Sequence, residues 1–123
     1  MTKDYKQRLA EVDEYALRLK ELVPTAMSAF GQLVRETQAP NALDKKTKEL
    51  IALAIGVKAQ CDACIGYHAR GALRAGASRQ EVAEAVMVSI QMGGGPAVNY
   101  AADALRAFDQ FAEAARAAEA AEA

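Results

Sequence analysis

The chain of 123 residues has no tryptophan, one histidine and only two cysteines, and it has no excess of charge of either sign. Fifteen basic and 16 acidic residues give a net charge of −1. This balance supplies no overall positive field for nucleic acid or for an anionic membrane surface. We therefore expect neither nucleic acid nor a membrane as a partner.

Long hydrophobic runs are also lacking. The longest, LIALAIGV at 50–57, is far shorter than the roughly 20 apolar residues that a membrane helix needs. The first residues, MTKDYKQRLAEVDEY, are charged and show no apolar core of a signal peptide. We expect a cytoplasmic protein, where two cysteines are more often reduced, reactive or metal-bound than a permanent crosslink.

No alternating pattern of a β-strand is present, and the three prolines stand between segments with helical spacing of apolar residues. The sequence therefore predicts one all-α domain over 1–123 with about six helices. Their expected ranges are 4–22, 24–38, 45–59, 61–75, 79–92 and 96–115. The tail 112–123 contains only alanine, glutamate and arginine, so we expect it to be helix-prone but to fray for want of an apolar face.

Two of the predicted helices are apolar on almost every side, between 50 and 57 and between 82 and 92. Such helices must be covered on every side. Six short helices can hardly do this, so we predict an obligate homo-oligomer with the fifth helix near an interface. A well-covered monomeric bundle is the alternative.

Both cysteines and the histidine fall within QCDACIGYHARG, residues 60–71. If a helix begins near Cys61, then Cys64 and His68 lie one turn apart on the same face. The helix dipole lowers the pKa of a thiol at that end, and an imidazole one turn on can take its proton. The Cys-x-x-Cys spacing also lets the two sulfurs form a disulfide.

Other interpretations of this stretch stay open at this point. Cys61, Cys64 and His68 could bind zinc, although a structural zinc site needs a fourth ligand that must then be a carboxylate or water. The three side chains could also be ordinary buried residues. Glu49 would lie about 4.5 Å from the level of His68 if two antiparallel helices meet near residue 60. Spacing alone, however, favours a solvated glutamate in a first helical turn.

Glu49, eleven residues, Cys-x-x-Cys and then His68 together resemble the signature of the carboxymuconolactone decarboxylase family, in its alkylhydroperoxidase AhpD-like branch. The similarity continues through YHARGALRAGASRQEVAEAVMVSIQMGGGPAVNYAADAL at 67–105 and covers a core of about 20–110. The resemblance implies an AhpD-like all-α bundle that assembles into trimers or hexamers.

The resemblance also implies roles for four residues. Cys64 would attack a hydroperoxide or a disulfide substrate, and Cys61 would resolve the product to a disulfide. Glu49 and His68 would form a proton relay. The reductant would be a dithiol, of the dihydrolipoamide type or on a peroxiredoxin partner, and neither an organic cofactor nor a metal is expected.

One departure from the pattern is Ala63, which stands where the branch has a second histidine. Peroxidase activity is then expected to be weak, or exchange between dithiols and disulfides to dominate. A decarboxylase-like lyase acting on a small lactone and a non-enzymatic, zinc-stabilised oligomeric module are the alternatives. Tyr67 and Arg70 are interpreted as packing or interface residues.

Overall fold

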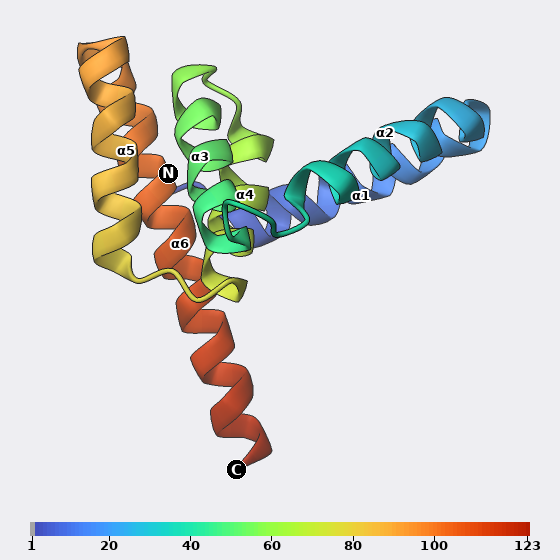
Figure 1. The fold of residues 1–123 in the computed structure, drawn as a ribbon. Coiled ribbons are helices and arrows are strands. Elements are labelled where there is room, and N and C mark those ends of the chain that lie inside the picture. The colour runs from blue at the N-terminus through green and yellow to red at the C-terminus, as the bar shows by residue number, and fades with distance from the viewer. Residues whose placement is uncertain (1) are drawn as a thin grey trace.

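The computed structural model describes residues 2–123, which form six α-helices and no β-strand (Figure 1). The helices are α1 Tyr5–Leu22, α2 Pro24–Gln38, α3 Lys45–Lys58, α4 Asp62–Arg74, α5 Arg79–Gly93 and α6 Gly95–Glu122. The all-α fold and the number of helices predicted from the sequence are confirmed.

The helix starts follow local capping chemistry. Side chains of Asp4, Asp44 and Ser78 accept backbone N–H bonds at the starts of α1, α3 and α5. Ser78 and Glu81 form the complete reciprocal capping box at α5. Pro24 is the first residue of α2, where its missing N–H is not needed.

The last helix differs from the prediction. It was expected to end near Ala115, but α6 continues to Glu122 and projects beyond the body of the molecule (Figure 1). The tail is exposed from Ala115 to its end, but it is helical there and not frayed as expected. Its alanine, glutamate and arginine residues are strong helix formers without a breaker, and intrinsic propensity extends the helix there.

The core lies between α3, α4, α5 and α6, which pack side by side, and the first turns of α1 close it (Figure 1). Its largest fully buried side chains are Tyr5, Leu9, Leu53, Ile65, Val57 and Val82. On α6 the core face consists largely of alanines at helical spacing, Ala97, Ala101, Ala104 and Ala107. Small side chains on this face let the neighbouring helices approach α6 closely.

The α1–α2 hairpin extends away from this core as an arm (Figure 1). The arm exposes large apolar side chains, among them Tyr15, Leu19, Leu22, Phe30 and Leu33. The outer faces of α3 and α5 expose Ile51, Ile55, Met87, Val88 and Met92. One chain alone therefore leaves the two apolar helices partly uncovered. Within residues 2–123, no helix combines the length and the hydropathy that crossing a membrane requires.

Candidate active site

The first turn of α4 holds the two cysteines. Cys61 is the N-cap, and its Sγ accepts the Cys64 N–H at 3.2 Å. The two residues are joined by a disulfide, with Cα atoms 5.2 Å apart. A tight turn between α3 and α4 places Cys61 at the start of α4. In this turn Gln60 has a positive φ of 56°, and the Cys61 N–H donates to the Gly56 carbonyl at 3.1 Å. The sequence-predicted pairing of both sulfurs at a helix start is present.

His68 lies one turn after Cys64 on α4 and meets a carboxylate from α3. His68 Nδ1 is 3.2 Å from Glu49 Oε1. The Glu49 side chain is 6% exposed, whereas that of His68 is 28% exposed. Glu49 is therefore not the solvated first-turn glutamate that spacing alone favoured, because α3 and α4 pack against each other along this stretch.

The charge state of Glu49 follows from two opposing effects. Burial raises the pKa of Glu49, whereas the hydrogen bond from His68 and the charges of His68 and Lys45 lower it. The lowering effects together outweigh burial, so the pKa lies below its usual value. An ionised carboxylate only accepts hydrogen bonds, so Nδ1 of His68 must carry the hydrogen. Nε2 is then the ring nitrogen that can accept a proton.

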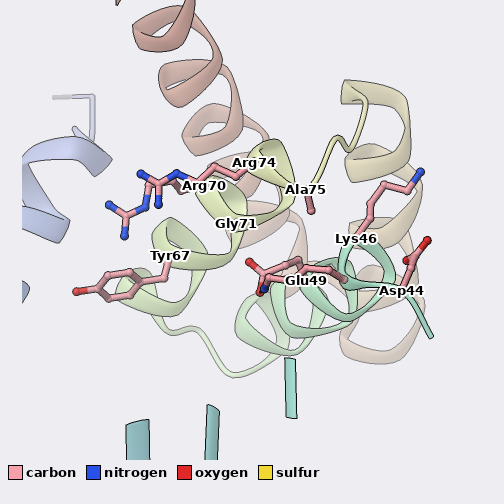
Figure 2. A pocket seen from close by; sticks show the side chains of 9 residues that line it. Asp44, Lys46, Glu49, Tyr67, Arg70, Gly71, Arg74 and Ala75 are labelled. Atoms are coloured by element: carbon pink, nitrogen blue, oxygen red, sulfur yellow. The ribbon is translucent and has the colours of Figure 1, made fainter. Parts of the chain in front are cut away.

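Gly71 makes room for the buried carboxylate. A Cβ atom at this position would lie 1.3 Å from Glu49 Oε2, so any other residue would displace the carboxylate. Figure 2 shows Glu49 directed at the α4 turn that contains Gly71. Sequence reasoning did not single out Gly71. The available signal was a glycine inside a helix, which lowers helix stability and needs a packing reason.

Lys45 is a second residue that the sequence did not indicate. It lies one turn before Glu49 on α3, with Nζ 3.7 Å from Glu49 Oε1. The same Nζ donates to Gln38 Oε1 at 3.3 Å, which ties α3 to the end of α2. The same carboxylate oxygen, Oε1, therefore lies near both an imidazole and an ammonium group.

Two cavities meet at Glu49. One, of about 350 Å³, is lined by His68, Tyr67 and residues of the α2–α3 connection. The other, of about 650 Å³, is lined by Glu49, Gly71, Tyr67 and a set of basic residues, Lys45, Lys46, Arg70 and Arg74 (Figure 2). Both cavities therefore reach Glu49, and the smaller one also reaches His68.

Tyr67 lines both cavities and Arg70 lines the larger one, in addition to their packing contacts. The Tyr67 hydroxyl donates to the Asp13 carboxylate on α1, and the Arg70 guanidinium lies 5.4 Å from the centre of the Tyr67 ring. The bond to Asp13 ties α4 to α1, and the Arg70 guanidinium also lies 5.9 Å from the centre of the Phe111 ring on α6, so both side chains pack between helices as expected from the sequence. Within residues 2–123, no three histidine, cysteine or acidic side chains are grouped closely enough to hold a metal ion.

These features define a class: an all-α protein with a cysteine pair at a helix N-terminus and a histidine–carboxylate pair further along the same helix. The model of the carboxymuconolactone decarboxylase family matches residues 21–107. The chain belongs to the carboxymuconolactone decarboxylase family, as the sequence resemblance indicated.

Relatives with and without structures support this assignment. An uncharacterised protein of Cupriavidus necator is 41% identical over 109 residues, which is 89% of this chain and 96% of the relative. A family member from Legionella pneumophila, solved in its apo form, superposes with a TM-score of 0.85 at 37% identity, covering 87% of this chain and 96% of that one.

A second solved structure, from Thermotoga maritima, superposes with a TM-score of 0.69 at 30% identity, covering 74% of this chain and 94% of that one. That protein is a member of the same family and is suggested to be involved in an antioxidative response.

Proposed function

We propose that this protein is a thiol-dependent peroxidase and disulfide oxidoreductase of the AhpD-like type, working in the cytoplasm. One observation carries the proposal: the helix that starts at the Cys61–Cys64 disulfide places His68 one turn on, in contact with the buried Glu49. The antioxidative role suggested for the Thermotoga relative supports the same chemistry.

In the first step, the Cys64 thiolate attacks the terminal oxygen of a hydroperoxide. The O–O bond breaks, Cys64 becomes a sulfenic acid, and the alkoxide leaves as an alcohol after taking a proton. His68 accepts the thiol proton at Nε2 and returns it to the alkoxide, while Glu49 holds the ring by its Nδ1–H. Cys64 is chosen as nucleophile because it is one helical turn from His68.

In the second step, the Cys61 thiolate attacks the Cys64 sulfur. The S–O bond breaks, hydroxide leaves as water, and the disulfide forms. A dithiol, of the dihydrolipoamide type or on a peroxiredoxin partner, then reduces the pair by two thiol–disulfide exchanges and is itself oxidised. A disulfide substrate would enter by the same exchange, and no organic cofactor is required.

The experiment is peroxide consumption by the reduced protein with a small dithiol as reductant. Cys64→Ser is expected to abolish turnover. Cys61→Ser is expected to react once and then stop as a sulfenic acid on Cys64, which a sulfenic-acid reagent traps. Peroxide consumption by Cys64→Ser at the wild-type rate would disprove the assignment, and lactone decarboxylation that persists in this variant would favour the lyase alternative.

We also propose that the chain assembles with copies of itself, as a trimer or hexamer. The support is the large apolar surface that one chain leaves open on the arm and on α3 and α5. Light scattering on Leu33→Glu is expected to show a smaller species than wild type. Gln32→Glu adds the same charge next to Leu33 without removing an apolar side chain and should assemble normally; a wild-type assembly in both variants would show that the arm is not an interface.

A further inference from the structure

Asp62 stands between the two cysteines as the first residue of α4. A negative charge at this place has two consequences of opposite sign. It stabilises the positive end of the helix dipole. It also opposes the formation of a thiolate on the cysteines around it, since like charges repel.

The chain supplies a counter-charge from its N-terminal segment. Lys3 Nζ lies 2.9 Å from Asp62 Oδ1 and 2.7 Å from Asp103 Oδ2 on α6. The Tyr5 hydroxyl donates to Asp62 Oδ1 at 3.1 Å, and Arg8 approaches the other carboxylate oxygen at 3.9 Å. Burial raises the pKa of Asp62, but the bonds from Lys3 and Tyr5 and the charge of Arg8 outweigh this and hold it below its usual value.

The segment that carries Lys3 is itself fixed in place. The Gln110 side chain on α6 donates to the Lys3 carbonyl at 2.6 Å and accepts the Tyr5 N–H at 2.9 Å. The Tyr5 side chain is completely buried in the core. Lys3 is therefore not a freely moving surface lysine, and its ammonium is held at the start of α4.

We propose that Lys3 is a charge-compensating residue that offsets the field of Asp62 at Cys61 and Cys64 and so sets the acidity of the thiols and the balance between dithiol and disulfide. The inference rests on the proposed redox function. In this role Lys3 does not act on the sulfurs by direct contact. It acts by pairing with the carboxylate of Asp62, which lies between the two cysteines. When the thiolate of a dithiol is stabilised, the dithiol is oxidised less readily in thiol–disulfide exchange than one whose thiolate is not stabilised.

Other charges lie on the elements packed against this turn. They are Arg8 on α1, Asp103 and Arg106 on α6, Lys58 in the last turn of α3, and the His68–Glu49 pair further along α4. Lys3 differs from all of them in bridging Asp62 and Asp103 at once. Among the described residues, removing Lys3 leaves Asp62 with the Arg8 ion pair at 3.9 Å and Asp103 with the Arg106 ion pair at 4.0 Å.

The test compares Lys3→Met, Asp62→Asn and the double variant. Thiol pKa values are read from the pH dependence of alkylation in reduced protein, one cysteine at a time in Cys61→Ser and Cys64→Ser backgrounds. Lys3→Met is expected to raise the thiol pKa by about half a unit and Asp62→Asn to lower it by a similar amount. The double variant should lie close to wild type, because the two opposite charges disappear together.

Equilibration with glutathione supplies the second readout. The two cysteine thiols give two electrons and two protons to glutathione disulfide, which becomes two glutathione thiols. At a pH above the thiol pKa, Lys3→Met should shift this equilibrium toward the protein disulfide by about threefold, and Asp62→Asn toward the dithiol. Lys3→Arg, which keeps the charge, and Lys6→Met, which removes a lysine outside the ion pairs with Asp62, should both behave like wild type.

A purely structural role for the contact predicts a different result. Either single variant breaks the same ion pair, so both would then move the pKa and the equilibrium in the same direction, or neither would. Either outcome overturns the inference. If the wild-type pair does not equilibrate with glutathione at all, the redox function itself fails; if it does so without regard to Lys3 and Asp62, only the charge compensation fails.

Discussion

The two halves of α4 carry different parts of the site in different ways. In the first turn, both cysteines are half-buried. Their spacing of three residues at the helix start is enough to bring the two sulfurs together. The middle of the helix holds His68 against a carboxylate that comes from α3 and is almost fully buried. The pair that would react with a substrate stays accessible, and the pair that would move protons is fixed by packing.

Among the changes considered, Gly71→Ala should disrupt the His68–Glu49 contact in the middle of α4 most severely. Its Cβ would overlap Glu49 Oε2, so the carboxylate must leave its position or α3 and α4 must separate. Overpacking of this kind costs about 1–3 kcal/mol of unfolding free energy, and the contact with His68 should be lost with it. Denaturant unfolding measures the first effect and peroxide turnover the second.

Gly31→Ala is the matched control for this change. Gly31 lies in α2, and a Cβ there would meet only the flexible Arg35 side chain at 3.4 Å. Since alanine is the better helix former, this variant should be neutral or more stable by up to about 1 kcal/mol. Equal unfolding curves for Gly71→Ala and wild type, with normal turnover, would show that the glycine is not what admits Glu49.

Glu49→Gln keeps the shape of the side chain and removes its charge. Peroxide turnover should fall about 100-fold, because an amide no longer stabilises a charged imidazole or fixes its Nδ1–H as donor. The redox equilibrium of the cysteine pair should change much less, since Glu49 lies beyond His68. Glu84→Gln on the exposed face of α5 is the control and should turn over normally; a Glu49→Gln rate equal to it would remove Glu49 from the relay.

The pH dependence of stability gives a milder test of the same contact. The pKa of Glu49 is lowered in the folded chain from its ordinary value of 4.5, so its contribution to stability is present above that value and is lost as pH falls through the lowered pKa. The difference in unfolding free energy between wild type and Glu49→Gln should therefore shrink in acid. A difference that stays constant or grows would mean that Glu49 is not ionised in the folded chain at neutral pH.

Tyr67→Phe is expected to have the smallest effect. It removes the hydrogen bond between α4 and Asp13 on α1 but leaves the ring in place. Exposed hydrogen bonds of this type contribute about 0.5–1.5 kcal/mol, so thermal unfolding should shift slightly and turnover should stay near wild type. A loss of activity as large as that of Glu49→Gln would assign Tyr67 a direct part in the chemistry.

The sequence predicted the parts of this molecule that depend on neighbours along the chain. Prolines, capping residues and apolar spacing placed the helices, and the Cys-x-x-Cys spacing placed the sulfurs at a helix start. Spacing brought Glu49 to the level of His68 but favoured a solvated side chain, and only the family resemblance gave it a role, because its contact with His68 depends on how α3 packs on α4.

The remaining features depend on contacts between distant segments. Gly71 matters because of a carboxylate 22 positions earlier, and Lys3 meets Asp62 across 59 positions and Asp103 across 100. The full length of α6 was underestimated because the prediction tied the end of the helix to the end of its apolar face. Contacts between helices are not encoded in local spacing, so no local pattern could pair these residues.

The most direct test of the account is the reaction of fully reduced protein with one equivalent of an alkyl hydroperoxide, followed by intact-mass analysis. We predict rapid loss of the mass of two hydrogen atoms in wild type, from closure of the Cys61–Cys64 bridge, and gain of one oxygen atom on Cys64 in Cys61→Ser. A wild-type chain that stays a dithiol while the peroxide persists, or a first oxygen found on Cys61, would contradict it.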